Sequence, residues 1–187
     1  IGPYVNFFEK ELSRFLDINY SVAFVNGTSA LQVALRVAGV KEKSEVITQA
    51  LTFVATANSI KYLYADPIFI DVDIDTMSMS PISLNKFLDE YGDKRDDGTY
   101  NKQTGNKISA CVPMHTFGFM SRIDQIIKIC KKWDIPVVED AAEALGSKFN
   151  GKPAGSFGLV SAFSFNGNKI ITSGRGGAIC SNNKHIA

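Results

Sequence analysis

Apolar residues recur along this chain with two periods, one typical of helices and one typical of strands. Residues 3–16 place Val5, Phe8, Leu12 and Phe15 on one stripe, which predicts an amphipathic helix. Short β-branched or aromatic runs between turn residues predict strands. We expect seven strands, at residues 21–26, 45–49, 67–72, 108–115, 136–139, 159–165 and 177–180.

Helical segments separate most of these strands. They are expected after residues 27–29, at about 53–64, at 83–91 and after residue 121, and capping-box spacing at Ser29 and Ser121 predicts two of the starts. Residues 92–107 are polar and predict a long loop that is either mobile or functional. The alternation predicts an α/β fold, a mostly parallel seven-stranded sheet flanked by helices, with function at the carboxyl ends of the strands.

Length and composition narrow the class of protein. A chain of 187 residues can form one sizeable domain with a buried core, and its formal net charge of +1 indicates neither a nucleic-acid partner nor an anionic membrane surface. Cys111, Cys130 and Cys180 lack metal-ligand spacing, so we expect no metal and a reduced, cytoplasmic protein. No membrane-spanning run or signal peptide is visible. The first residue is Ile1 rather than Met, and we expect the chain to be a fragment.

One lysine follows an apolar strand in residues 161–177. A polar turn presents Lys169, and Gly174, Gly176 and Gly177 come next. Glycines allow the backbone to approach a bulky group closely, and a lysine held there is placed for Schiff-base chemistry. The alternative is a surface lysine in a glycine-rich turn.

Two more features lie where strands end. Gly27, Thr28 and Ser29 stand between a strand and a helix start, where free amides and the helix dipole favour phosphate, although Ser29 could be only a cap. Asp140 ends an apolar strand, where a carboxylate can stabilise a protonated ring nitrogen. It could instead cap a segment at 141–145 or hold a ribose, but no Gly-x-Gly-x-x-Gly supports dinucleotide binding.

Two residues with aromatic rings are further candidates for cofactor or substrate binding. Phe53 follows the second strand, where it could cover a planar cofactor, although a core aromatic is the commoner case. His115 lies at another strand end, either as a substrate or ring contact or as a packed histidine. A phosphate turn, an acid, a flat ring and a lysine, all at strand ends, suit pyridoxal phosphate better than other cofactors.

The sequence resembles the DegT/StrS-type family of nucleotide-sugar aminotransferases. The matching stretches occur in the family's order and cover most of the chain. They are Asn26-Gly-Thr-Ser-Ala-Leu31, Thr52-Phe-Val-Ala-Thr-Ala-Asn58, Asp71-Val-Asp73, Val112-Pro-Met-His-Thr-Phe-Gly118, Glu139-Asp-Ala-Ala-Glu-Ala-Leu-Gly146 and Ser164-Phe-Asn-Gly-Asn-Lys169.

The resemblance implies a fold-type-I pyridoxal-phosphate enzyme and a role for each matching residue. It implies that Lys169 bonds to the cofactor and moves protons, and that Asp140 pairs with the pyridine nitrogen. For the other positions it implies that Phe53 stacks on the ring, that Thr28, Ser29 and Ser164 bind the phosphate, and that Glu143 contacts the phenolic oxygen. Gln or His is commoner than Glu at position 143. Arg175 is a second departure from the family. Asn166-Gly167-Asn168 and residues 92–107 resemble a subgroup that handles amino sugars for surface glycans.

The resemblance also implies a function for the whole protein. That function is transfer of an amino group, from glutamate as the expected donor, to a keto group on a nucleotide-linked deoxysugar. Residues 1–187 would form the cofactor-binding large domain of a homodimer with shared active sites, and the small C-terminal domain is not in this sequence. The alternatives are a sugar dehydratase, in which the family replaces the lysine by histidine, and a non-catalytic or regulatory relative, which should have lost Lys169, Asp140 or Ser164.

Overall fold

Helices and strands alternate through residues 2–186, which are the residues that this computed structural model describes. The helices are α1 (Pro3–Leu16), α2 (Gly27–Val37), α3 (Val54–Lys61), α4 (Pro81–Tyr91), the 3-10 helix η1 (Thr116–Gly118) and α5 (Ile123–Lys132). The strands are β1 (Tyr20–Phe24), β2 (Glu45–Gln49), β3 (Asp66–Ile70), β4 (Gly92–Arg95), β5 (Gly98–Asn101), β6 (Lys107–Val112), β7 (Val138–Asp140), β8 (Lys148–Phe149), β9 (Lys152–Pro153), β10 (Val160–Ser164) and β11 (Gly177–Ser181).

The strands form mixed sheets rather than one clearly continuous parallel sheet. Hydrogen bonds define a four-stranded sheet in the order β1-β11-β10-β7 and a five-stranded sheet in the order β3-β2-β6-β5-β4. Single parallel bridges, Cys111 with Val137 and Met114 with Asp140, link β6 to β7 and so connect the two sheets. The pairs β2–β3, β2–β6 and β7–β10 are parallel, whereas β11 is antiparallel to both β1 and β10.

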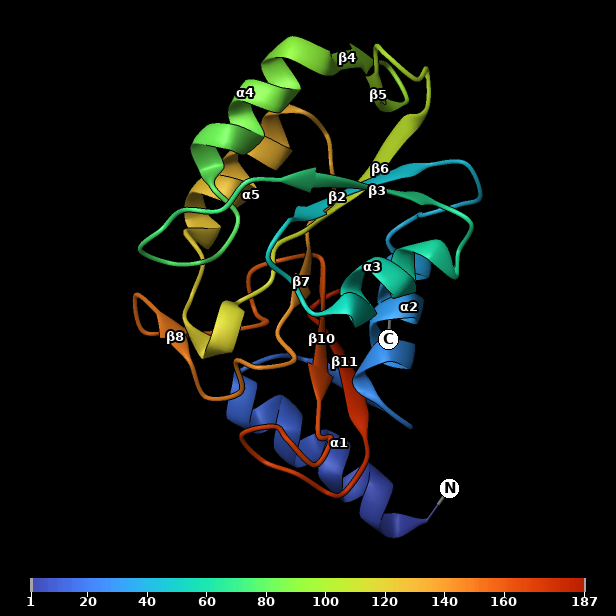
Figure 1. Cartoon of the computed structure of the whole chain (residues 1–187). Helices are drawn as coiled ribbons and strands as arrows, with labels where there is room; N and C mark the ends of the chain where they lie inside the picture. The colour runs from blue at the N-terminus through green and yellow to red at the C-terminus, as the bar shows by residue number, and fades with distance from the viewer. Residues whose placement is uncertain (1, 187) are drawn as a thin grey trace.

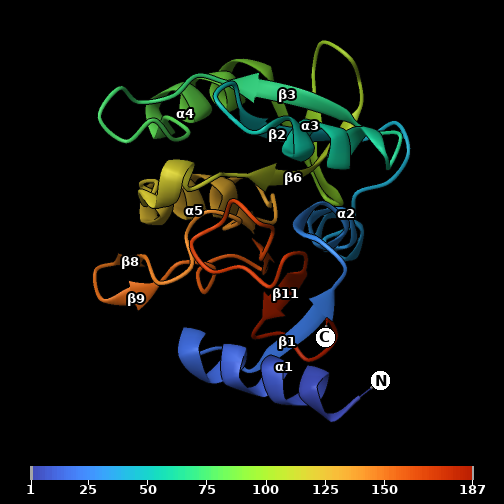
Figure 2. The same ribbon diagram turned by 60° about the horizontal axis from the view of Figure 1, so that its bottom comes forward.

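Helices cover both faces of these sheets, which gives a three-layer arrangement (Figure 1). α2 and α3 pack on one face, where Leu31, Leu35 and Ile60 join a buried cluster with strand residues such as Val112 and Ala162. On the other face, α4 and α5 cover Ile47 and Cys111, and α1 covers β10 and β11. Figure 2 shows α1 beside β1 at one end of the molecule and α4 at the other.

The expected loop at residues 92–107 is the main error of the sequence-based prediction. The structure forms the antiparallel hairpin β4–β5 there, and β5 pairs with the beginning of β6. β4 lies at the edge of the sheet and carries charged side chains, and β5 is a short strand of glycine and polar residues, so neither strand shows an apolar alternation. Arg95 stacks over Tyr100, with 4.0 Å between its guanidinium carbon and the ring centre.

Two helix starts also differ from the capping-box prediction. α2 begins after Asn26, whose Oδ1 accepts the backbone N–H of Ser29 at 2.7 Å. α5 begins at Ile123 without a side-chain cap, and Ser121 hydrogen-bonds to the His115 ring instead. Serine hydroxyls bond to turns and side chains as readily as to helix ends, so the capping-box spacing alone did not locate these starts.

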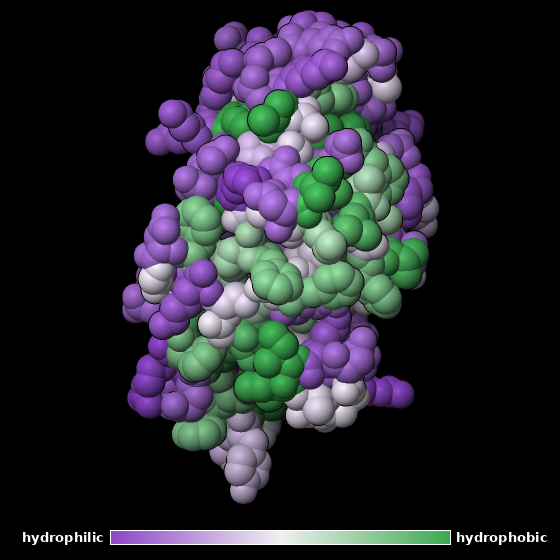
Figure 3. All heavy atoms as spheres, turned by 60° about the vertical axis from the view of Figure 1, so that its left-hand side comes forward, coloured by the Kyte–Doolittle hydropathy of each residue, from purple (hydrophilic) through white to green (hydrophobic). Residues whose placement is uncertain are grey.

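The surface changes character along the molecule. In the view of Figure 3, the end that carries α4 and β4 is mostly hydrophilic, and apolar side chains spread over the middle and lower parts. Within residues 2–186, no helix has both the length and the apolar character needed to cross a bilayer.

Candidate active site

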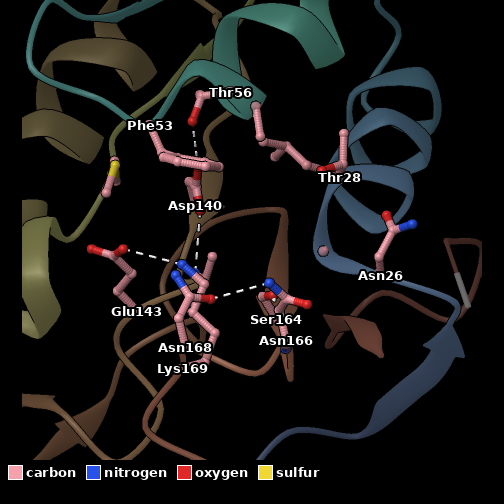
Figure 4. Close-up of a pocket in the computed structure, with 15 residues that line it drawn as sticks. Asn26, Thr28, Phe53, Thr56, Asp140, Glu143, Ser164, Asn166, Asn168 and Lys169 are labelled. Atoms are coloured by element: carbon pink, nitrogen blue, oxygen red, sulfur yellow. Dashed lines mark hydrogen bonds and ion pairs between the residues drawn. The ribbon is translucent and has the colours of Figure 1, made fainter. Parts of the chain in front are cut away.

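A cavity of about 310 Å³ opens at the carboxyl ends of β6, β7 and β10, beside the start of α2. Its volume falls at the lower end of the range for small-ligand sites. Figure 4 shows side chains from these elements pointing into the same space. The lining residues are Asn26, Gly27, Thr28, Leu31, Phe53, Ala55, Thr56, Met114, Asp140, Ala142, Glu143, Ser164, Asn166, Asn168 and Lys169.

Lys169 lies in a loop whose two ends are joined. The backbone N–H of Phe165 donates to Gly176 at 2.9 Å, and the N–H of Lys169 donates to Asn166 at 3.0 Å. Its side chain is 11% exposed, and Nζ lies 3.1 Å from Glu143 Oε1. Nζ also lies 5.6 Å from the ring centre of Phe53, within reach of a cation–π contact. The lysine therefore reaches into the cavity and away from bulk water.

Asp140 is the last residue of β7 and is buried at the floor of the cavity. Its Oδ2 accepts the hydroxyl of Thr56 at 2.7 Å, and its Oδ1 accepts the backbone N–H of Ala142 at 3.2 Å. Burial raises the pKa of Asp140, and the Thr56 hydrogen bond opposes this rise. A cationic donor at this carboxylate would replace lost hydration and favour its charged form.

The amino end of α2 meets the end of β10 at close range. A Cβ on Gly27 would lie 2.7 Å from Cβ of Ser164, and a Cβ on Gly177 would lie 2.4 Å from the carbonyl oxygen of Asn26. These contacts require glycine at both positions. The amides of Gly27 and Thr28 belong to the first helical turn and have no intrahelical acceptors. The space between the start of α2 and Ser164, which we call the anion corner, therefore suits an anion.

The structure brings together most of the residues that the sequence singled out. Lys169, Asp140, Glu143, Phe53, Thr28 and Ser164 all line the cavity. Phe53 is 59% exposed, so it forms an open wall rather than part of the core. Ser29 is not among the lining residues, and its amide is bonded to Asn26.

His115 lies outside the cavity and is fully buried. Its Nε2 lies 3.0 Å from Glu139 Oε2, and Ser121 contacts Nδ1. Glu139 also accepts the backbone amides of Gly155, Phe157 and Gly158. Burial by itself would raise the pKa of Glu139, but His115 and the amides outweigh it and hold that pKa below its usual range. This placement supports the packed-histidine interpretation rather than the substrate contact.

Among the lining residues that received no role from the sequence, two make hydrogen bonds that support the site. Thr56 holds Asp140, and Asn26 caps α2 at the cavity. Asn26 could have been found from its position directly before the helix, since Asn is a favoured N-cap. Thr56 stands within a family-like stretch, but its partner is 84 positions away in the chain, so no local pattern identifies it.

The residues present fit pyridoxal phosphate. The Gly27–Ser164 corner is open only because position 27 lacks a Cβ, and it combines helix-start amides with hydroxyls of Thr28 and Ser164. Asp140 is a buried carboxylate with remaining acceptor capacity, suited to a ring N–H. Lys169 supplies an amine between these two ends of the cavity (Figure 4).

Comparisons with known proteins agree with this geometry. The profile of the DegT/DnrJ/EryC1/StrS aminotransferase family matches residues 1–187. The chain is 41% identical over 184 residues to EpsN of Bacillus subtilis (strain 168), which is provisionally named a pyridoxal phosphate-dependent aminotransferase, covering 98% of this chain and 45% of that protein. It is 38% identical over 185 residues to GDP-perosamine synthase of Escherichia coli O157:H7, covering 99% of this chain and 46% of that protein.

A solved structure shows the same fold. The crystal structure of a DegT DnrJ EryC1 StrS aminotransferase from Brucella abortus superposes with a TM-score of 0.90 at 31% identity, covering 100% of this chain and 48% of that one. The chain thus spans less than half the length of the relatives it matches. The family profile covers every residue, and the chain therefore belongs to the DegT/DnrJ/EryC1/StrS aminotransferase family.

Proposed function

We propose that this chain is the cofactor-binding large domain, residues 1–187, of a pyridoxal-phosphate-dependent aminotransferase that acts on a keto group of a nucleotide-linked deoxysugar. The observation that carries the proposal is the convergence of Lys169, Asp140 and Phe53 on one cavity from three separate parts of the chain. Each is of the residue type that this cofactor requires, and the anion corner at Gly27 and Ser164 provides a place for its phosphate.

The cofactor, when bound, would supply an electron sink at its ring. The Asp140 carboxylate would hold a proton at the ring nitrogen, which would keep the ring able to accept electrons. Phe53 would lie against the flat ring and limit its contact with water. The hydroxyls of Thr28 and Ser164 and the amides at the start of α2 would bind and orient the phosphate, with Ser29 strengthening the turn. Lys169 Nζ would be the group that bonds to the cofactor and then moves the proton of the reacting carbon.

The names of the relatives support the substrate class. GDP-perosamine synthase is among them, and its name refers to a nucleotide-linked amino sugar. Glutamate as amino donor, surface-glycan biosynthesis as the pathway class and the cytoplasm as the compartment are parts of the same proposal. The proposal gives His115 no contact with the substrate, because its ring is buried against Glu139.

Exposed apolar side chains around the cavity support a homodimer with shared active sites. Phe53, Phe117 and Ile170 are 59%, 70% and 62% exposed, and each lies in or beside a segment that forms the cavity. Large apolar side chains gathered at a site are a feature of surfaces that become covered on association. Apolar side chains are visible across the middle of the face in Figure 3.

Borohydride trapping tests the cofactor and the lysine together. The full-length protein is mixed with pyridoxal phosphate, reduced and digested, and the modified lysine is located by mass spectrometry. We expect a dominant adduct on Lys169 that is absent from Lys169→Ala, and loss of transamination in that variant with an unchanged circular dichroism spectrum. Scattered labelling, or full turnover by Lys169→Ala, would contradict the proposed mechanism.

A further inference from the structure

Both carboxylate oxygens of Glu143 are occupied by donors. Oε1 lies 3.1 Å from Lys169 Nζ, and Oε2 accepts the backbone N–H of Phe117 at 3.0 Å. In a glutamine placed the same way, an NH2 group would replace one of these oxygens and would face one of the two donors. A carboxylate therefore matches both donors at this position, and the contact is sheltered, since the side chains of Lys169 and Glu143 are 11% and 21% exposed.

The hydrogen bond from the Phe117 amide orients the Glu143 carboxylate toward Lys169. Phe117 has a left-handed backbone with φ 53°, and Gly118 follows with φ 85°. Ser147 donates to the carbonyl of Gly118 at 2.6 Å, which ties this turn to the segment that carries Glu143. Because the Phe117 amide is held in place, Glu143 cannot swing away without breaking that hydrogen bond. Its other oxygen, Oε1, stays directed at the lysine nitrogen, as Figure 4 shows for the Glu143–Lys169 pair.

We propose that Glu143 is an acid–base catalyst for bond formation between Lys169 and an aldehyde cofactor, an inference that rests on the proposed function. Glu143 takes a proton from the Lys169 ammonium, and the neutral amine attacks the aldehyde carbon to form the C–N bond. The carbonyl oxygen then leaves as water. Both protons that it gains come from the lysine nitrogen and pass through Glu143. One proton remains on the C=N nitrogen, the carboxylate is restored, and the charge is conserved.

If Glu143 only formed a static ion pair with Lys169, its removal would change the reaction rate in the opposite direction. A carboxylate that only stabilises the ammonium lowers the supply of neutral amine, so its removal would make the lysine react faster. A carboxylate that carries protons speeds the reaction, and its removal slows it. General acid–base groups contribute about 10²- to 10⁴-fold to such steps. The two roles are therefore separated by the direction of the change in rate.

The test measures how fast cofactor-free, full-length protein forms the C=N bond with pyridoxal phosphate, followed by stopped-flow absorbance. We expect Glu143→Gln to be at least about 10²-fold slower than the unmodified protein. Glu143→Asp keeps the carboxylate, so its rate of bond formation should fall less than that of Glu143→Gln. Glu11→Gln is the matched control, because Glu11 pairs with Arg14 on α1 and, within residues 2–186, is not among the residues that line the cavity, so the rate of this variant should not change.

Chemical rescue excludes a purely structural effect. Added formate should speed bond formation in Glu143→Ala and leave the unmodified protein unchanged, an effect that a folding defect could not produce. An equal or faster rate in Glu143→Gln, or no rescue by formate, would overturn the role of Glu143 while leaving the proposed function intact. Absence of any adduct at Lys169 in the unmodified protein would overturn the proposed function and this inference with it.

Discussion

Thr56 donates its hydroxyl to Asp140 Oδ2 at 2.7 Å, from α3 to the end of β7. Thr52 in turn bonds to Thr56 at 2.8 Å, so two hydroxyls in series reach the buried acid. Thr56 is itself buried, and its hydrogen bond lowers the pKa of Asp140 against the effect of burial. The geometry makes Thr56 a positioning residue for the carboxylate that would face the ring nitrogen.

Replacing Thr56 tests this relationship. Thr56→Val removes the donor and keeps the shape, so we expect a less ionised Asp140 and weaker cofactor binding. A hydrogen bond to a charged group is worth about 1.5–3 kcal/mol, which corresponds to a roughly 10- to 150-fold rise in the cofactor Kd. Thr56→Ser keeps the hydroxyl and should stay near the parent value. Equal Kd values for Thr56→Val and the parent in a fluorescence titration would remove Thr56 from this role.

Asp140→Asn should affect turnover more than phosphate anchoring. The amide has the same shape but no charge, so it cannot favour a protonated ring nitrogen. We expect kcat to fall by roughly 10- to 150-fold, equivalent to about 1.5–3 kcal/mol, and the affinity for inorganic phosphate as a probe of the anion corner to stay within a few-fold. Steady-state kinetics and phosphate competition measure the two effects separately. An unchanged kcat would show that the Asp140 charge is not used.

Gly177→Ala should displace the start of α2. The added Cβ would lie 2.4 Å from the carbonyl carbon and oxygen of Asn26, which are backbone atoms and cannot rotate away. Overpacking of this kind costs about 1–3 kcal/mol, so we expect a lower free energy of unfolding and weaker cofactor retention.

Gly167→Ala is the matched control for that variant. Gly167 lies in the loop that carries Lys169, has nothing within 4 Å of an added Cβ, and is not among the glycines with positive φ. Its stability in chemical denaturation should equal or slightly exceed that of the parent, because alanine restricts the unfolded chain. Similar losses in both variants would show that contact with Asn26 is not the cause.

Glu139 gives a pH-dependent prediction with a definite sign. Its pKa in the folded protein lies below the ordinary value of 4.5, so its stabilising contribution is fully present above that pH. As the pH falls through the lowered pKa, the unfolded chain binds the proton more readily and the contribution is lost. Glu139→Gln lacks this effect and leaves buried donors without acceptors, so it should be about 2–5 kcal/mol less stable at neutral pH.

Urea unfolding from neutral to acidic pH would measure the difference between the two proteins. The difference should shrink below pH 4.5, since only the parent loses the contribution of an ionised Glu139. Asp140 changes the free energy of unfolding in the opposite direction, because its raised pKa makes the folded state less stable as the pH rises. Both proteins contain Asp140, so its effect cancels in the difference between them. A stability difference between the two proteins that stays constant from neutral to acidic pH would contradict the lowered pKa of Glu139.

Local patterns in the sequence were sufficient to place the main strands and the two principal chemical groups. Each of the seven expected strands exists, with ends shifted by at most a few residues. Most of them are buried strands, which carry continuous apolar runs, and β1 and β3 are rich in β-branched or aromatic residues although they are partly exposed. Lys169 and Asp140 could be singled out because each follows such a run, and parallel strands bring their carboxyl ends to one edge. The hairpin β4–β5 was missed because β4 is charged and β5 consists of glycine and polar residues, so neither strand carries an apolar run.

The sequence by itself therefore determined the order of elements, the family and the residues that end the strands. The tertiary structure alone decided the partners: Thr56 for Asp140, the Phe117 amide for Glu143, and Glu139 for the His115 ring. These contacts join residues that are 84, 26 and 24 positions apart. Secondary-structure periodicity reports only on neighbours within a few residues. Which acid meets which donor is fixed when the sheets and helices pack and exclude water.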